Sequence, residues 1–319
     1  MTPFILPDLP KKHPNKFKAM KSALPHFDAS SLRLALLATV VAFSLGVYAT
    51  DSPNQRVREL AGRAEAESEF MRGRNYLNGS GTEKDYAKAI ECFRKAAEQG
   101  NCRAQNNLGS MYYQGLGTTR DINEAVKWYR KAAEGGAGMA QWSLSLMLLS
   151  GLEIPKDVKE AVHWLTIAAE HGMVSAQYKL GELNYFGDQI DRNYEQAANW
   201  MTKAADGGDV DSLNYLGLMY ERGQGVTKDE KKAAEYYKKC AESGNAKAKY
   251  NLGRAYIYGV GVEKDWVAAY RWLYDSKWAG ELAASKLMEE LEHKMSKEEL
   301  KEATRLVEAL KLGSQTAKS

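Results

Sequence analysis

Glycine pairs separated by one residue are the part of this sequence closest to a ligand-binding motif. They occur at Gly79/Gly81, Gly115/Gly117, Gly223/Gly225 and Gly259/Gly261. A phosphate-binding turn built on such a pair needs a third glycine after a strand, or a Gly-Lys dipeptide, and the chain has neither. The pairs therefore predict turns between helices.

The other residue types that perform chemistry are scattered. The five histidines, His13, His26, His163, His171 and His293, lack the spacing of a zinc site. No Ser-x-x-Lys tetrad places a lysine base beside a nucleophilic serine. We therefore expect no catalytic residue, no cofactor and no metal, and predict that the protein is not an enzyme.

Three cysteines are present, and we expect no disulfide framework from them. Cys92 and Cys240 are predicted to lie in the middle of helices. Cys102 follows a helix end about ten residues from Cys92, too far along a helix axis for an easy disulfide.

Residues 1–49 differ from the rest of the chain. They carry six Lys or Arg against two Asp, a net charge of +4, which leaves about −1 of the total +3 for the remainder. The remainder therefore has no excess of positive charge with which to bind nucleic acid.

The uncharged run of residues 34–50 has two interpretations. It fits a signal peptide cleaved after Ala49, because Val47-Tyr48-Ala49 has the form of a cleavage site, and it is also just long enough for a membrane anchor. Translation could begin at Met1 or Met20. In both cases the basic flank stays in the cytoplasm. We expect export to the periplasm or secretion, or alternatively a single-pass inner-membrane protein with its repeats on the periplasmic side.

From residue 68 to residue 280 the sequence repeats with a constant period of 36. Three positions recur in all six repeats: Gly79, Gly115, Gly151, Gly187, Gly223, Gly259; Ala89, Ala125, Ala161, Ala197, Ala233, Ala269; and Gly100, Gly136, Gly172, Gly208, Gly244, Gly280. A fourth position holds N-cap residues that open a second helix: Asp85, Asp121, Asp157, Asn193, Asp229 and Asp265. Glu124, Glu160 and Gln196 stand at capping-box distance from their caps. The last recurrent Gly of each repeat is expected to end that helix in the left-handed conformation.

A first helix precedes each of these caps, with the pattern A-Q-x-x-L-G-x-x-Y-x-x-G. In Ala104 to Gly115 the apolar positions share one face, and the Gly after the Leu (Gly109, Gly181, Gly217, Gly253) allows the paired helix to approach. The aromatic residues are predicted to lie in the core or at the contact between the two helices of a hairpin: Trp128, Trp164, Trp200, Tyr236 and Trp272. The fold class is therefore all-α, a solenoid of six helix-turn-helix repeats in which each hairpin buries its apolar face against the next.

The flanks of the array complete the predicted organisation. Residues 50–67 form a linker and an extension of the first helix, reaching back to about Gln55. Residues 281–313 form capping helices that end at Gly313, with Ser296 and Glu299 as a capping box, and residues 314–319 form a disordered tail. Ser145, Glu153 and Pro155 mark the third repeat as the most irregular one.

With these motifs in hand, the chain resembles the Sel-one-like repeat (SLR) family, relatives of the tetratricopeptide repeats, as a bacterial exported or membrane-anchored member. The unit that carries the resemblance is Ala104 to Gly136, AQNNLGSMYYQGLGTTRDINEAVKWYRKAAEGG. The resemblance implies an adaptor whose partner differs from case to case. Some cysteine-rich exported relatives bind or slowly hydrolyse β-lactams, but they carry paired cysteines in each repeat and this sequence does not.

Three functions remain open from the sequence. The first is a non-enzymatic protein-protein interaction scaffold of the bacterial cell envelope that binds another protein or a peptide on the concave face of the superhelix. The second is a binder of cell-wall glycan or peptide, favoured by aromatic platforms flanked by acidic residues. The third is a β-lactam-binding or hydrolysing enzyme. Membrane contact is expected only through the N-terminal apolar segment.

The predicted partner-binding positions lie on the first helices, about a third of a turn away from their core residues. In repeats two and three they are Asn107, Ser110 and Gln114, then Ser143, Leu146 and Ser150; repeat six adds Asn251. Unlike the cap positions they vary between repeats, which suggests freedom from structural duty. The proposed binding residues are those with interface-type side chains and their neighbours: Lys179, Glu182, Phe186, Tyr215, Leu218, Arg222, Arg254 and Tyr258.

Overall fold

The computed structural model describes residues 53–316, with side chains described for residues 55–309. It divides into two compact units, with the boundary in the sequence between Arg120 and Asp121. The described part of the first unit contains α3 (Pro53–Asn78), α4 (Tyr86–Glu98) and α5 (Cys102–Gln114). The predicted leader, with its apolar run, lies outside the described residues.

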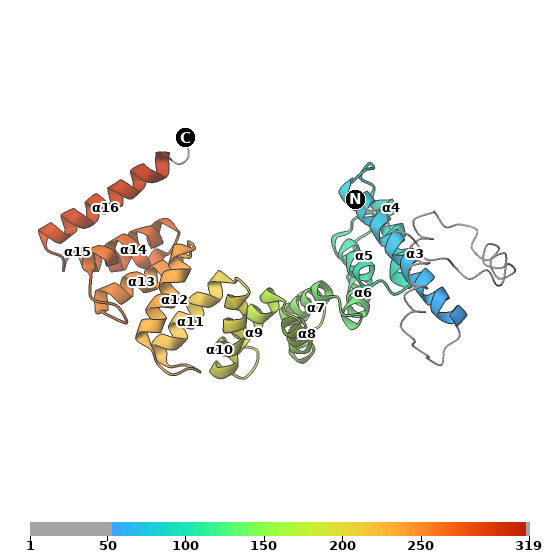
Figure 1. Ribbon diagram of the computed structural model, residues 1–319, viewed down its shortest axis with the longest axis horizontal. Helices are drawn as coiled ribbons and strands as arrows, with labels where there is room; N and C mark the ends of the chain where they lie inside the picture. Colours follow the sequence, from blue (N-terminus) through green and yellow to red (C-terminus); the bar gives the residue numbers. More distant parts are fainter. Residues whose placement is uncertain (1–52, 317–319) are drawn as a thin grey trace, which may run out of the picture. The chain divides into compact units, whose positions relative to one another are not determined.

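The second unit continues the alternation of first and second helices (Figure 1). It contains α6 (Ile122–Glu134), α7 (Gly138–Ser150), α8 (Val158–Glu170), α9 (Val174–Phe186), α10 (Tyr194–Asp206), α11 (Val210–Arg222), α12 (Glu230–Glu242), α13 (Ala246–Tyr258), α14 (Trp266–Trp278), α15 (Leu282–Glu292) and α16 (Lys297–Thr316). Within residues 53–316 every element is a helix, so the all-α prediction is confirmed. None of these helices is both long enough and apolar enough to cross a membrane.

The N-cap residues and the glycines that follow the second helices adopt the conformations that the repeat pattern predicts. Each of the six cap side chains accepts a hydrogen bond from the backbone N–H three residues later, at 2.9–3.0 Å. The recurrent glycines after the second helices, from Gly100 to Gly280, have φ between 84° and 100°. A side chain there would be strained, so these glycines set the chain reversal that starts the next repeat.

In the fourth, fifth and sixth repeats the hairpin closes where a glycine of the first helix meets a bulky side chain of the second. A Cβ added to Gly181 would lie 2.9 Å from Met201, and one added to Gly253 would lie 2.8 Å from Leu273. Gly217 faces Tyr237 in the same way. These bulky residues directly follow the aromatic positions singled out in the sequence. Met201, Tyr237 and Leu273 are fully buried, while among the aromatic residues only Trp128 is buried and the other four are half-buried.

From the first repeat to the fourth, successive repeats are joined by a hydrogen bond that the repeat pattern did not predict. The glutamine of the A-Q pattern is buried and donates its side-chain amide to a carbonyl at the end of the preceding second helix. Gln141 donates to Ala133 O at 3.1 Å and Gln177 to Ala169 O at 3.0 Å. In the first unit Gln105 donates to Ala97 O at 3.0 Å. A helix end without such a partner would leave its last carbonyls unsatisfied.

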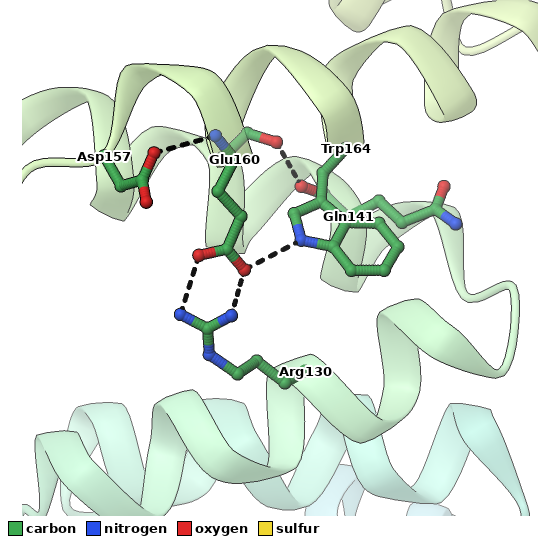
Figure 2. A network of polar contacts seen from close by, with 6 residues as sticks. Arg130, Gln141, Asp157, Glu160 and Trp164 are labelled. Carbon is green, nitrogen blue, oxygen red and sulfur yellow. Dashed lines mark hydrogen bonds and ion pairs between the residues drawn. The ribbon is translucent and has the colours of Figure 1, made fainter.

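The capping-box prediction for Glu160 is wrong in its second half. The Glu160 backbone N–H donates to Asp157 as expected. The Glu160 carboxylate, however, accepts hydrogen bonds from both terminal nitrogens of Arg130 on α6 and from the indole N–H of Trp164 (Figure 2). Glu124 likewise pairs with Lys127 at 2.8 Å. A charged partner competes better for a carboxylate than a neutral N–H does. The Glu160 position therefore links neighbouring repeats.

The C-terminal helices pack on α14, and the capping box predicted there is complete. Ser296 N–H donates to Glu299 at 2.8 Å and Glu299 N–H to the Ser296 hydroxyl at 3.2 Å. Ala303 and Val307 are buried on the predicted apolar stripe. The predicted stop at Gly313 is wrong, because α16 continues to Thr316. A glycine costs a helix interior about 1 kcal/mol without ending it.

Candidate partner-binding surface

The eight predicted binding residues lie on three first helices of the second unit. Lys179, Glu182 and Phe186 are on α9, Tyr215, Leu218 and Arg222 on α11, and Arg254 and Tyr258 on α13. Two of them are large and well exposed, Phe186 at 45% and Tyr258 at 52%. Both end their helices, immediately before the left-handed glycines Gly187 and Gly259.

Phe186 and Tyr215 meet in an aromatic cluster with Tyr178, Tyr185 and Tyr194. The ring centroids of Phe186 and Tyr215 are 6.0 Å apart with an interplanar angle of 89°, and Tyr185 touches both at 5.3 Å. Tyr178 and Tyr194 extend the cluster through Tyr215 and Tyr185. Edge-to-face contacts of this kind are the preferred arrangement of aromatic pairs. The cluster therefore joins α9 and α11 and leaves Phe186 as its exposed member.

The hydroxyl groups of this cluster sit in a partly desolvated environment. Burial raises the pKa of Tyr185 and of Tyr215, because the charged phenolate is disfavoured away from water. The Tyr185 hydroxyl donates a hydrogen bond to Gln224 Oε1 at 3.5 Å, and Gln224 lies two residues beyond Arg222. The charges of Arg222 and Arg192 oppose the rise in the Tyr185 pKa. Arg192 contacts the same cluster, since its guanidinium donates to the Tyr194 hydroxyl at 3.4 Å.

Arg254 is engaged in a different role from the one predicted. Its guanidinium donates to both carboxylate oxygens of Glu221 at 2.6–2.7 Å, and the Tyr237 hydroxyl donates to the same carboxylate at 2.7 Å. This network joins α11, α12 and α13. Arg254 thus has a structural duty, and the expectation that its position is free of one is wrong.

Other predicted positions are also tied into the structure. Lys179 pairs with Glu182 at 2.6 Å on the same helix. Leu218 is half-buried against the core around Tyr237. Asn251 is buried and donates to Asn214 at 2.9 Å, so it is not a surface residue. The helical angle could not show which neighbours from the next repeat cover these residues.

Three residues of the surface were missed from the sequence: Tyr178, Tyr185 and Arg192. Tyr185 precedes Phe186, and the Tyr-Phe doublet was the one available signal. Arg192 belongs to a basic position that recurs in all six repeats: Lys84, Arg120, Lys156, Arg192, Lys228 and Lys264. Its guanidinium donates to Phe186 O at 2.8–3.1 Å and so satisfies the carbonyl end of α9.

The thiols and acidic groups offer no obvious ligand set. Cys92 and Cys240 lie buried within α4 and α12, as expected, and all three thiols are free. Across residues 53–316 no three His, Cys, Asp or Glu side chains are placed to hold a metal ion. What the surface on α9, α11 and α13 presents is apolar rings beside guanidinium groups, a combination suited to holding another molecule.

Comparison with known proteins gives the same repeats. The family model described as Sel1 repeat matches residues 66–101, 102–136, 138–173, 174–209, 210–245 and 246–274. A Sel1 repeat protein from Oxalobacter formigenes is 34% identical, with a TM-score of 0.60, over 69% of this chain and 86% of that one. A protective antigen of uropathogenic Escherichia coli with an SLR fold is 28% identical, with a TM-score of 0.51, over 78% of this chain and 63% of the antigen. The chain belongs to the Sel1 repeat family.

Proposed function

We propose that the protein is a non-enzymatic scaffold of the bacterial cell envelope that holds a partner protein or peptide on the concave face of its superhelix. Sel1 repeat proteins are commonly protein-protein interaction scaffolds. The observation that carries the proposal here is the exposure of Phe186 and Tyr258 at the ends of α9 and α13, with Arg222 at the end of α11 between them in sequence. Aromatic and Arg side chains are the usual anchors of protein interfaces.

The aromatic cluster favours a protein or peptide over a glycan. Glycan binding would use open ring faces flanked by acidic residues. Here the Tyr185, Phe186 and Tyr215 rings stand at 70–90° to one another, so they cover one another's faces. The charges that act on the Tyr185 hydroxyl are those of Arg222 and Arg192. Glu182, which pairs with Lys179, and Asp211 act on the Tyr215 hydroxyl. An extended polypeptide with apolar side chains fits this surface better.

The location in the envelope rests on residues 1–50, which lie outside the described part of the chain. Their basic flank and apolar run support export by either of the two routes, cleavage or retention as an anchor. A reporter fused after Thr316 distinguishes the two sides of the membrane. A cytoplasmic signal would refute the envelope role.

The binding face is tested by photocrosslinking of the full chain in its native cell. A photoreactive amino acid replaces Tyr258 on α13, and in a matched variant it replaces Lys238, which is exposed on the second helix α12. The proposal predicts a specific adduct from position 258 and none from position 238, identified by mass spectrometry. An adduct from position 238 alone would assign the partner to the second helices instead.

A further inference from the structure

Arg222 is a cation that the fold itself does not require. At the equivalent last residue of the first helix the other repeats carry Asn78, Gln114, Ser150, Phe186 and Tyr258. The negative end of a helix dipole favours a cation, but the recurrent basic residue of each repeat already supplies one. Lys228 holds that position for α11, beside Gly223. Arg222 is therefore an additional charge.

The carboxylates near Arg222 do not neutralise it. Glu221 precedes it but binds Arg254 and Tyr237 with both oxygens. Asp188 and Asp191 are exposed on the loop that leads to Arg192. Among the described residues, neither Arg222 nor Arg192 forms an ion pair with any carboxylate. The two guanidinium groups near Tyr185 thus have charge left for an external anion.

An apolar anchor lies next to these charges. The Tyr185 hydroxyl donates to Gln224, two residues beyond Arg222, at 3.5 Å, and the Tyr185 ring packs against Phe186 with ring centroids 5.3 Å apart. Phe186 is also held by Tyr215, so its position is fixed although 45% of it is exposed. The surface therefore offers a rigid aromatic ring and a pair of cations that two neighbouring side chains of one bound peptide can contact together.

We propose that the surface formed by Tyr185, Phe186, Arg192, Tyr215 and Arg222 binds an acidic peptide segment of the partner, in which a Glu or Asp stands beside a large apolar side chain. The carboxylate lies against the guanidinium groups of Arg222 and Arg192, and the apolar side chain against Phe186 and Tyr215. Arg suits this role because its planar group donates two parallel hydrogen bonds to a carboxylate. The inference rests on the proposed scaffold function and adds the chemistry of the partner.

Synthetic peptides test this chemistry on the full chain. Fluorescein-labelled Gly-Ser-Glu-Phe-Glu-Ser-Gly is compared by fluorescence anisotropy with versions carrying Gln for both Glu, Ala for Phe, or Lys for both Glu. The first peptide is expected to bind saturably and at least about tenfold more tightly than each of the others, the gain expected of a charge-assisted contact or a buried ring. Equal binding of the Lys or Gln version, or no saturable binding of the acidic peptide, would overturn the proposal.

Three variants locate the binding. Arg222→Ala should weaken the acidic peptide at least about tenfold, and Gln114→Ala, the equivalent position on α5, should leave it unchanged. Arg222→Glu should reverse the preference toward the Lys peptide, an outcome that loss of folding cannot produce. Unchanged binding in Arg222→Ala would overturn the assignment.

The same variant separates this inference from the scaffold function. If Arg222→Ala leaves the adduct from position 258 intact, the acidic-segment proposal fails and the scaffold function stands. If position 258 gives no adduct in the unmodified chain, the scaffold proposal itself fails.

Discussion

The third and fifth repeats share one hairpin geometry but fill three equivalent positions differently. Ser145, Glu153 and Ser150 in the third repeat correspond to Gly217, Gly225 and Arg222 in the fifth. Ser145 is buried and turns its hydroxyl back to Gln141 O at 2.5 Å, whereas Gly217 lies directly under the Tyr237 ring. The third repeat has Leu165 at the position equivalent to Tyr237.

This contrast separates two kinds of position. At the hairpin seam, the volume allowed to the first-helix residue depends on how closely the second helix approaches. An added Cβ would overlap Tyr237 at Gly217 and would lie 2.8 Å from Leu273 at Gly253, whereas the third repeat accommodates Ser145. At the end of the first helix, Ser150 and Arg222 have no such partner volume to match. Differences between repeats in the seam residues therefore reflect packing. Differences between repeats at the end of the first helix can instead reflect partner binding.

The largest difference between the two repeats is expected at the seam. Gly217→Ala should lower the free energy of unfolding by about 1–3 kcal/mol, because the added methyl overlaps the buried Tyr237 ring. Ser145→Ala should change it by less than about 0.5 kcal/mol, since the lost hydrogen bond is offset by a better helix former. Hydrogen exchange along α7, α8, α11 and α12 measures both. Equal destabilisation by the two changes would remove the volume argument.

A smaller difference in stability is expected between substitutions of Glu221 and Glu160, the two carboxylates that form ion pairs between repeats. Glu221→Gln should destabilise by about 1–2 kcal/mol, because Arg254 and the Tyr237 hydroxyl both lose a charged acceptor. Glu160→Gln should cost less than about 1 kcal/mol, since its partner Arg130 has a more exposed side chain, 42% against 28% for Arg254. Chemical unfolding midpoints decide the order, and a larger effect at Glu160 would contradict it.

Alkaline pH should act on the fifth repeat and leave the equivalent positions of the third unaffected. Burial raises the pKa of Cys240 from an ordinary value of 9.0 to about 12, and burial with the Glu221 hydrogen bond also raises the pKa of Tyr237. The native state therefore holds these protons longer than the unfolded state, so stability is complete below about pH 9 and is lost as pH rises toward 12. The third repeat has Leu165 and Ala168 there, which do not titrate.

The Cys240→Ser variant checks this pH dependence. Serine is the natural residue at the equivalent position of the sixth repeat, where Ser276 donates to Ala246 O at 2.7 Å much as Cys240 donates to Val210 O at 3.1 Å. Stability measured at about pH 8 and about pH 11 should fall less in the variant than in the unmodified chain. An identical fall in both would exclude Cys240 as a contributor.

The hairpins could be predicted from the sequence because their signals are local. Asp157 caps a helix through an N–H three residues away, and Gly172 ends it through its own backbone conformation. Both signals lie within a single helix, so they can be predicted without knowing how neighbouring repeats pack. The residues that line one face of a first helix follow from the same local geometry, which is why Phe186 and Tyr258 were correctly expected at the surface.

The contacts between first helices could not be predicted in this way. The Arg254 and Glu221 pair joins residues 33 positions apart, and the Asn251 and Asn214 pair joins residues 37 apart, neither equal to the period of 36. Whether such side chains meet depends on the rotation and shift from one hairpin to the next. That small displacement converts Arg254 and Asn251 from apparent surface residues into structural ones.

The most direct test of the separation between structural and recognition positions is the variant Arg222→Ser/Tyr258→Ser, which gives the fifth and sixth repeats the residue that the third carries at Ser150. The photoreactive group is placed at position 186, and adduct yield and thermal unfolding are measured together on the full chain. We predict an unfolding free energy within about 0.5 kcal/mol of the unmodified protein and loss of the adduct. An adduct that persists, or one that disappears only because the array unfolds, would contradict the account.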